Sequence, residues 1–326
     1  MNIAALAPDR EAPSCRYRLS QCRAALEDRG IKLTVSEIPR RRAARAECFT
    51  RAGQAEAVIL HRKLLTGFDF SRLRRLSPRL TYDFDDAVLY RDSQSGRFFS
   101  RTRLRRFARQ AARADLVIAG NQYLAEAAAR FADRVVISPT PVDLADYPET
   151  LPASNPGTIG WMGTSSNFVY LRDLVPALRR VLKNRPGRRL LVVSDRTPDL
   201  DGLPFEFRTW SPAVQHQALT EFSLGLMPLR DDPWARGKCA YKVLQYFAAG
   251  LPVIASPVGM NRSVIREGTN GLLPDDEDSW VEALENLLRD PPARERLGRA
   301  GRSLVAEKYS LEAIVPRLAG LLKGET

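Results

Sequence analysis

Two lysines stand at the start of an expected helix in the C-terminal half of this sequence. Lys238 and Lys242 come just before apolar residues that recur at helical spacing, and Gly250 ends that pattern. The residues at 253–255 are then apolar enough to form a buried parallel strand. Because the first N–H groups of a helix attract anions, cations at this position predict a binding site for phosphate.

The N-terminal half offers a different chemistry, based on carboxylates and a histidine. Asp85 and Asp86 follow an expected strand at 80–83, and ligands of parallel sheets bind where the strands end. These carboxylates could take a proton from an acceptor hydroxyl, coordinate a metal, or pair with arginines in a structural network. His61 follows another strand and is either a catalytic group or a packed loop residue. We treat Asp85, Asp86 and His61 as candidate catalytic residues.

Alternating strands and helices must position these side chains. The expected strands lie at 2–7, 31–35, 57–60, 80–83, 116–119, 135–137, 158–162, 189–193, 224–227 and 253–255. The expected helices lie at 17–29, 100–112, 170–183, 213–221, 279–290, 292–309 and 311–323, with a further one around Lys242. Strands that alternate with helices imply an α/β fold with parallel sheets.

The length of the chain favours two domains. A chain of 326 residues exceeds one comfortable hydrophobic core. The proline-rich stretch at 140–157 is the expected linker between the domains. We therefore predict an N-terminal domain at 1–148, a C-terminal domain at 157–308 and an amphipathic C-terminal helix at 309–326.

Several segments of the C-terminal half occur in the order and spacing of a known family. They lie at 159–164, 190–195, 224–229, 238–259 and 268–273. Together they resemble the nucleotide-binding motifs of the family-4 retaining glycosyltransferases. The resemblance implies the GT-B architecture, an α/β fold of two Rossmann-like domains whose parallel sheets face a central cleft, with the last helix returning to the N-terminal domain. It also implies transfer of a sugar from a nucleotide diphosphate to an acceptor hydroxyl.

The resemblance further implies which residues bind the donor sugar nucleotide. These donor-binding candidates are Gly163, Thr164, Lys238, Lys242, Gln245, Ser256, Val258 and Gly259. The family carries a pair of glutamates at the helix start, but this sequence has Gln245 at the second position and Gly237 or Lys238 at the first. A glutamine carbonyl still accepts a hydrogen bond from a ribose hydroxyl, as a weaker neutral acceptor. Lys238 and Lys242 would replace the cations that the family often places after the first strand of this half.

The acceptor candidates follow strands of the N-terminal half. Arg16 and Arg18 stand where the family usually has a glycine-rich loop, which suggests an anionic acceptor such as a lipid-linked phosphate. Asn121 either contacts the acceptor or caps the helix that starts at Gln122.

The resemblance also suggests how the reaction proceeds. No carboxylate nucleophile stands at the aligned position, so a front-face reaction assisted by the leaving phosphate fits retention. Domain closure would expel water from the donor. The resembled family needs no metal, and we expect no metal and no other cofactor.

Arginine dominates the charge of the N-terminal half. The net charge is +12, and residues 1–150 hold 27 basic against 18 acidic side chains. The arginines at 40–45, 72–75 and 101–113 would be attracted to phosphate, on an anionic membrane surface or on nucleic acid. With no run of eighteen apolar residues and no recognisable signal peptide, we expect a cytoplasmic protein, peripheral at the inner membrane face. Four cysteines without close pairing predict reduced thiols.

Three other functions fit parts of the sequence. A nucleotide-sugar-binding protein without transferase activity would explain the missing glutamate pair. A nucleic-acid-binding protein would explain the arginine clusters, although the aromatic side chains expected of a stacking surface are not interleaved with them. The third alternative, a dinucleotide oxidoreductase, is weakened because no G-x-G-x-x-G motif follows the first expected strand of either half.

Overall fold

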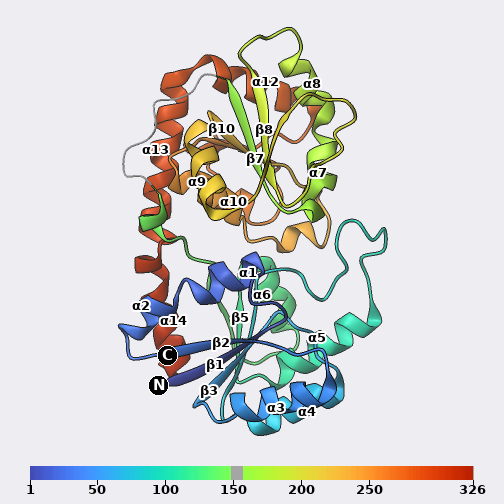
Figure 1. Cartoon of the computed structure of the whole chain (residues 1–326), viewed down its shortest axis with the longest axis vertical. Helices are drawn as coiled ribbons and strands as arrows, with labels where there is room; N and C mark the ends of the chain where they lie inside the picture. The colour runs from blue at the N-terminus through green and yellow to red at the C-terminus, as the bar shows by residue number, and fades with distance from the viewer. Residues whose placement is uncertain (148–156, 326) are drawn as a thin grey trace. The chain divides into compact units, whose positions relative to one another are not determined.

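The protein has the α/β fold with two parallel sheets that the sequence predicts, and each sheet has six strands (Figure 1). A computed structural model describes residues 1–147 and 157–325. The chain divides into two compact units. Unit 1 comprises residues 1–141, 236–239 and 309–326, and unit 2 comprises residues 142–235 and 240–308. Within the described residues, every helix is too short or too polar to cross a membrane.

The sheet of unit 1 has the strand order β2-β1-β3-β4-β5-β6. Its strands are β1 (Asn2–Ala7), β2 (Lys32–Glu37), β3 (Ala57–His61), β4 (Leu80–Phe84), β5 (Leu116–Ala119) and β6 (Val135–Ile137). This order is the flavodoxin-like variant of the doubly wound fold, in which the strand order reverses between β1 and β3. Ligands of such sheets bind beyond the carboxyl ends of the strands at that reversal.

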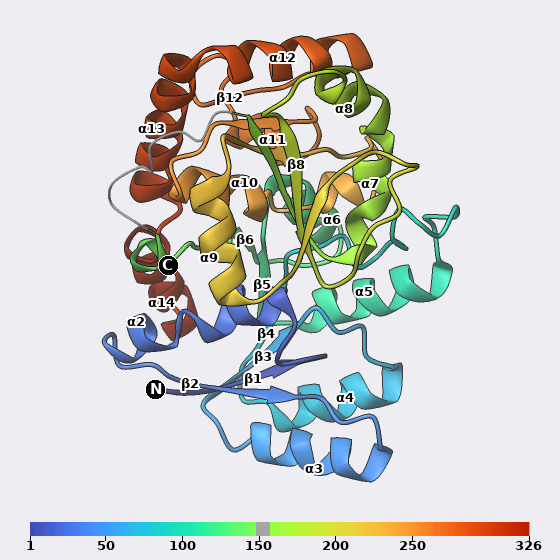
Figure 2. The ribbon, with the colours of Figure 1, turned by 45° about the horizontal axis from the view of Figure 1, so that its top comes forward.

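The helices of unit 1 include one segment from the far end of the chain. They are α1 (Pro13–Cys15), the π-helix η1 (Arg16–Ser20), α2 (Arg23–Glu27), α3 (Arg42–Ala52), α4 (Gly67–Leu76), α5 (Arg101–Arg113), α6 (Gln122–Ala129) and α14 (Leu311–Lys323). One apolar cluster joins Ile3 of the sheet to Leu26 of α2 and Val315 of α14. The helices α3, α4 and α5 lie side by side (Figure 2).

The sheet of unit 2 has the strand order β12-β11-β10-β7-β8-β9. Its strands are β7 (Thr158–Met162), β8 (Arg189–Ser194), β9 (Glu206–Thr209), β10 (Leu224–Met227), β11 (Val253–Ala255) and β12 (Gly271–Leu272). This is the order of dinucleotide-binding folds, with its reversal between β7 and β10. The residues that follow β7 and β10 are therefore where a ligand of unit 2 is expected.

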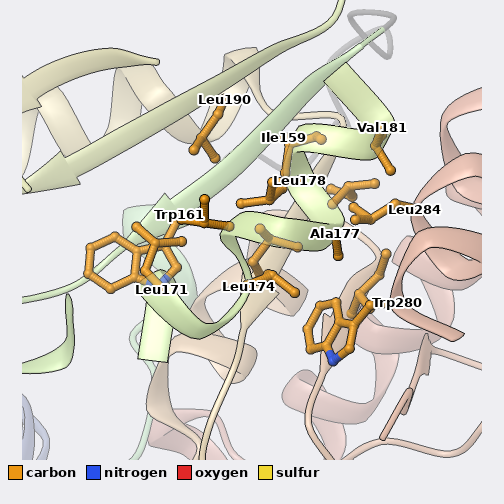
Figure 3. Close-up of a cluster of buried hydrophobic side chains, with 14 of the residues drawn as sticks. Ile159, Trp161, Leu171, Leu174, Ala177, Leu178, Val181, Leu190, Trp280 and Leu284 are labelled. Carbon is orange, nitrogen blue, oxygen red and sulfur yellow. The ribbon is translucent and has the colours of Figure 1, made fainter. Parts of the chain in front are cut away.

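Ten helical segments accompany this sheet in the described part of the chain. They are η2 (Leu144–Asp146), η3 (Ser165–Asn167), α7 (Phe168–Asp173), α8 (Val175–Leu182), α9 (Pro212–Glu221), η4 (Ala235–Gly237, at the border of the units), α10 (Tyr241–Ala248), α11 (Asn261–Val264), α12 (Glu277–Arg289) and α13 (Pro291–Lys308). A large apolar cluster joins β7 to α7, α8 and α12 (Figure 3). Trp161 and Trp280 are its largest side chains, and both are buried.

Two glycines let aromatic rings lie directly on the central strands of unit 2. Gly160 of β7 and Gly225 of β10 are paired in register. A Cβ atom on Gly160 would lie 2.1 Å from the Phe222 ring, and one on Gly225 would lie 2.4 Å from the Tyr246 ring. The two rings also contact each other, with centroids 6.2 Å apart. Because Tyr246 belongs to α10, the glycines set how closely α10 approaches the sheet.

The structure differs from the sequence prediction at several elements. The helix expected at 17–29 is divided into η1 and α2, where the side chains of Gln21 and Cys22 contact the carbonyls of Tyr17 and Arg18. The helix expected at 170–183 is two helices, α7 and α8. Pro176 lies in the first turn of α8, where its missing N–H is tolerated. The short strands β9 and β12 were not predicted, whereas the free state of the cysteines is confirmed.

Replacing Gly160 by alanine should destabilise the protein. The new Cβ would overlap the Phe222 ring, and overpacking of this kind costs about 1–3 kcal/mol of unfolding free energy. Urea unfolding of the single variant measures this cost. In a Phe222→Leu background the same substitution should cost less, because the ring that it meets is gone. Equal costs in the two backgrounds would contradict the packing described here.

Candidate functional site

In unit 2, a lysine side chain lies against the backbone that follows β7. The Gly163 N–H donates to the Val193 carbonyl at 3.1 Å, which continues the β7–β8 pairing by one residue. A Cβ atom on Gly163 would lie 2.9 Å from Cε of Lys242 and 2.7 Å from the Trp161 ring. The structure therefore brings together the predicted candidates Gly163 and Lys242, one from the end of a strand and one from the first turn of α10.

The start of α10 is fixed by a strained residue and by a tyrosine. Ala240, the residue before the helix, has φ +50° in the left-handed region, and no side chain caps the helix start. Such strain in a residue other than glycine costs about 1–3 kcal/mol and is concentrated at functional sites. The Tyr246 hydroxyl accepts a hydrogen bond from the Met162 N–H at 2.9 Å, which ties the helix to β7. The positive end of α10 is thus held close to the end of β7.

Gln245 is buried and carries an unsatisfied amide. Its side chain lies one turn after Lys242 on α10, and the residue is 5 % exposed. Among the described residues, nothing accepts a hydrogen bond from its Nε2 atom. A buried polar group that lacks a hydrogen bond lowers the stability of the folded protein by about 1–3 kcal/mol. A ligand that supplies an acceptor would recover this free energy, and Gln245 is therefore the strongest polar candidate for ligand contact in unit 2.

The loop after β11 is held by its own hydrogen bonds. Ser256 Oγ accepts from the Leu229 N–H at 2.9 Å, and the Ser256 carbonyl accepts from Asn261 Nδ2 at 3.0 Å. Val258 is buried, and Gly259 adopts φ +53°. The Ser256 hydroxyl thus joins the loops that follow β10 and β11. In this position it supports the shape of the strand-end region.

Thr164 belongs to a turn that is fixed by a neighbouring carboxylate. Its hydroxyl accepts from Asn167 Nδ2 at 2.9 Å. The next residue, Ser165, donates to Asp195 from its N–H at 2.6 Å and from its hydroxyl at 2.8 Å. Although partial burial by itself would raise the pKa of Asp195, these hydrogen bonds lower it. Asp195 lies directly after β8 and was not a candidate from the sequence.

In unit 1, a buried ion pair joins the helical segment after β1 to the end of β4. Arg18 contacts both carboxylate oxygens of Asp83, with Nε–Oδ distances of 2.8 and 2.9 Å. His61 Nδ1 lies 2.7 Å from the same carboxylate. Arg18 also donates to the Ser138 carbonyl at 2.9 Å. Arg18, predicted to bind the acceptor, is only 5 % exposed and is engaged in this network.

The charges of this network stabilise each other. Burial by itself would raise the pKa of Asp83, but Arg18 and the hydrogen bond with His61 lower it to about 2. Burial by itself would lower the pKa of Arg18, but the Asp83 carboxylate raises it. Because an ionised carboxylate only accepts hydrogen bonds, Nδ1 of His61 must carry the hydrogen. Nε2 of His61 is buried without a hydrogen-bond partner among the described residues.

The two other candidate carboxylates pair with a second arginine. Arg62 Nη2 donates to Asp86 at 2.5 Å, and Arg62 Nε lies 3.5 Å from Asp85. Arg62 has φ +57°, in the region that favours glycine. The sequence left open whether these carboxylates are catalytic or part of an ion-pair network, and the structure places both of them in ion pairs. Arg62 itself is half-buried.

Asn121 caps a helix and also holds the segment 236–239. Its Oδ1 accepts from the Leu124 N–H at 2.9 Å at the start of α6. Its Nδ2 donates to the carbonyls of Gly237 and Lys238, each at 3.1 Å. This segment belongs to unit 1, whereas Lys242 belongs to unit 2. The two lysines that the sequence predicted at one helix start therefore lie in different units.

The remaining acceptor candidate, Arg16, begins η1. Its guanidinium lies over the ring of the next residue, Tyr17, 5.2 Å from the centroid. Among the residues that sequence reasoning missed, Tyr246 is the clearest. Its apolar neighbours in the sequence indicate only a buried helix, and nothing there shows that its hydroxyl would reach the end of β7.

Removing the Asp83 carboxylate should change how stability depends on pH. Its folded pKa of about 2 lies below the ordinary 3.8, so its stabilisation is complete above about pH 4 and is lost as the pH falls towards 2. Asp83→Asn leaves Arg18 buried without its partner and should cost about 3–5 kcal/mol near neutral pH. In urea unfolding, the difference in unfolding free energy between wild type and variant should shrink by about 1 kcal/mol as the pH falls from about 5 to about 3.

The matched control for this prediction is Asp201→Asn. Asp201 is exposed and has φ +55°, a conformation that asparagine also tolerates. The control substitution should change stability by less than about 0.5 kcal/mol. If the loss of unfolding free energy caused by Asp83→Asn stayed constant with pH, it would contradict the paired, ionised state of Asp83.

Residues 156–290 match a family model described as "Glycosyl transferases group 1". Among curated proteins, the alpha-D-kanosaminyltransferase of Streptomyces kanamyceticus is 34 % identical over 83 residues. This alignment covers 25 % of the present chain and 22 % of the relative. The chain thus aligns with about a fifth of the length of this relative, and the similarity is confined to a part of each protein.

Solved structures resemble the whole chain. The sucrose-phosphate synthase of Thermosynechococcus elongatus has a TM-score of 0.79 at 18 % identity, covering 99 % of this chain and 98 % of its own. Anabaena HepE, solved in complex with UDP-glucose, has a TM-score of 0.75 at 16 % identity, covering 99 % of this chain and all of its own. At such identities the likeness establishes the fold. The protein therefore has the GT-B fold, and its residues 156–290 are similar to the group 1 glycosyl transferases.

Proposed function

We propose that this protein is a retaining glycosyltransferase. It moves a sugar from a nucleotide-diphosphate sugar to an acceptor hydroxyl, in the cytoplasmic synthesis of a cell-surface glycan or glycolipid. The observation that carries the proposal is the contact of Lys242 with Gly163, at the strand reversal of the sheet that matches the glycosyltransferase family. A cation, a helix start and a strand end meet there, which is the arrangement that binds a diphosphate in α/β folds.

Gln245 supports the donor side of this proposal. Its buried Nε2 has no partner in the described part of the chain, so a bound nucleotide would satisfy a group that the free protein leaves unsatisfied. A ribose hydroxyl can accept from this amide and can also donate to its carbonyl. Unlike a carboxylate, the amide does not repel the diphosphate that Lys242 attracts.

The chemistry assigned to Lys242 is stabilisation of the leaving group. When the bond between the anomeric carbon and the phosphate oxygen breaks, negative charge grows on the nucleoside diphosphate, and a fixed cation lowers the barrier. The acceptor oxygen then bonds to the same face of the anomeric carbon, and its proton passes to the departing phosphate oxygen. This front-face course retains the configuration without a protein nucleophile.

Unit 1 supplies the acceptor groups in this proposal. Asp85 and Asp86 are held by Arg62 at the end of β4, and His61 is held by Asp83 at the end of β3. We assign Asp85 and Asp86 to orienting the acceptor hydroxyl. Because Asp83 fixes the ring of His61, Nε2 is the atom left for a ligand.

Replacing Lys242 should remove most of the affinity for the donor. UDP-glucose is the first donor to test, because HepE was solved with it. For wild type, a donor at a hundred times its dissociation constant adds about 2.7 kcal/mol of stability. With Lys242→Gln the affinity should fall by about tenfold or more, since a charge-assisted bond is worth about 1.5–3 kcal/mol. The readout is the thermal shift titrated with UDP-glucose and with UDP.

The control for this experiment is Lys183→Gln, which removes an exposed lysine that follows α8 in the same unit. It should leave the shift unchanged. A wild-type shift in the Lys242 variant would place the diphosphate elsewhere. Donor-dependent product formation then separates a transferase from a protein that only binds nucleotide sugars, and the anomeric configuration of the product tests retention.

Replacing Gln245 by leucine should have opposite effects on stability and binding. The leucine removes a buried, unsatisfied amide, which should raise the unfolding free energy of the free protein by about 1 kcal/mol. It also removes the proposed ribose contact and should weaken UDP binding. Unfolding in urea with and without UDP measures both effects. A variant that is less stable but binds UDP as well as wild type would contradict the assignment.

A further inference from the structure

The large apolar side chains that unit 1 exposes lie among its arginines. In the part of the chain that the structure describes, the exposed large hydrophobic side chains are Phe68 (62 % exposed), Phe99 (76 %) and Leu104 (40 %). Phe68 belongs to α4, Leu104 belongs to α5, and Phe99 lies just before α5. Exposed apolar side chains are common singly, but a group of them next to one kind of charge marks an interaction surface.

The arginines of this region come from three neighbouring helices. The helix α5 carries six arginines and no acidic residue. Arg42, at the start of α3, lies over the Phe68 ring, 4.8 Å from its centroid. Arg109 of α5 lies beside Gly67, because a Cβ atom there would be 2.1 Å from its Nη1. These contacts place a cation from α3 over the Phe68 ring and a cation from α5 beside the preceding residue, Gly67.

Leu104 and Arg105 extend this surface along α5. They lie five and four residues before Arg109, respectively, about one turn of helix away. Arg103, in contrast, turns inward and donates to the Val88 carbonyl at 2.9 Å. We name the exposed set the arginine–phenylalanine face, made of Arg41, Arg42, Phe68, Phe99, Leu104, Arg105 and Arg109. In Figures 1 and 2, the helices α3, α4 and α5 that carry it lie next to one another.

We propose that the arginine–phenylalanine face docks on an anionic lipid bilayer. Arginines attract the phosphate of lipid headgroups, and the apolar side chains between them insert at the boundary with the acyl chains. Charge complementarity favours this occupant, because α5 carries six arginines and no acidic residue, and four of these arginines are exposed. A nucleic acid would use the cations and stack bases on aromatic rings, but it has no use for the aliphatic Leu104. The docking needs no sugar donor and is independent of the proposed reaction.

The test is co-sedimentation of the full chain with vesicles. Wild type should bind vesicles of phosphatidylcholine mixed with phosphatidylglycerol and should bind phosphatidylcholine alone much more weakly. Replacing Arg42, Arg105 and Arg109 together by glutamine should reduce binding to the anionic vesicles by about a hundredfold, at about fivefold per arginine. The matched control replaces Lys183, Arg185 and Arg296 of unit 2, which are also exposed, and should bind as wild type does.

A second pair of variants tests the apolar contribution separately. Phe68→Ser with Leu104→Ser should weaken binding to anionic vesicles most clearly at high salt, where the attraction between charges is screened. In Phe99→Trp, brominated lipid should quench the new tryptophan if this position enters the bilayer. Circular dichroism checks that each variant is folded, which is expected because the replaced side chains are exposed.

Three results would overturn the proposal. They are equal binding to neutral and anionic vesicles, unchanged binding of the triple arginine variant, and binding of the face to single-stranded nucleic acid but not to vesicles. Loss of donor binding in the Lys242 variant would leave vesicle binding intact, so the two proposals fail separately.

Discussion

The contact of the Tyr246 ring with Gly225 is the interaction on which the site of unit 2 depends. Without a Cβ atom on Gly225, the ring lies directly against the strand, and its hydroxyl reaches the N–H of Met162, the last residue of β7. The helix α10 is thereby fixed against β7, with its first turn beside Gly163. The positions of Lys242 and Gln245 follow from this packing, because both lie on that helix.

Several unfavourable features of the structure lie at the carboxyl ends of its strands or on the helix α10. Ala240 and Arg62 adopt left-handed conformations, and Gln245 and His61 each keep a buried nitrogen without a partner. Each of these features costs free energy in the free protein. Well-packed cores, such as the cluster around Trp161, stabilise the fold despite these costs. The unpaired nitrogens of Gln245 and His61 suit a ligand-binding edge, because a ligand can satisfy what the protein leaves unsatisfied.

Arginine serves two separate purposes in unit 1. Arg18 and Arg62 are buried or half-buried and paired with carboxylates, where they fix the ends of β3 and β4. Most arginines of α3 and α5, such as Arg42, Arg105 and Arg109, are exposed and add to the net charge of the protein. The net charge alone does not reveal this division. Burial and ion-pair partners distinguish an arginine that fixes the end of a strand from one that is exposed on the surface.

The sequence by itself determined the α/β class, the two parallel sheets and the candidate residues at the strand ends. The periodicity of apolar residues and the positions of glycines carry that information, because the pattern of a helix or a strand depends on residues that are close together in the sequence. It could not determine which strand ends are neighbours, that Asp83 rather than Asp85 or Asp86 holds Arg18 and His61, or that Lys238 and Lys242 belong to different units. Those facts depend on residues that are distant in the chain, such as the 65 positions between Arg18 and Asp83. Only the packing of the tertiary structure selects such partners, because burial makes each charge require one specific opposite charge.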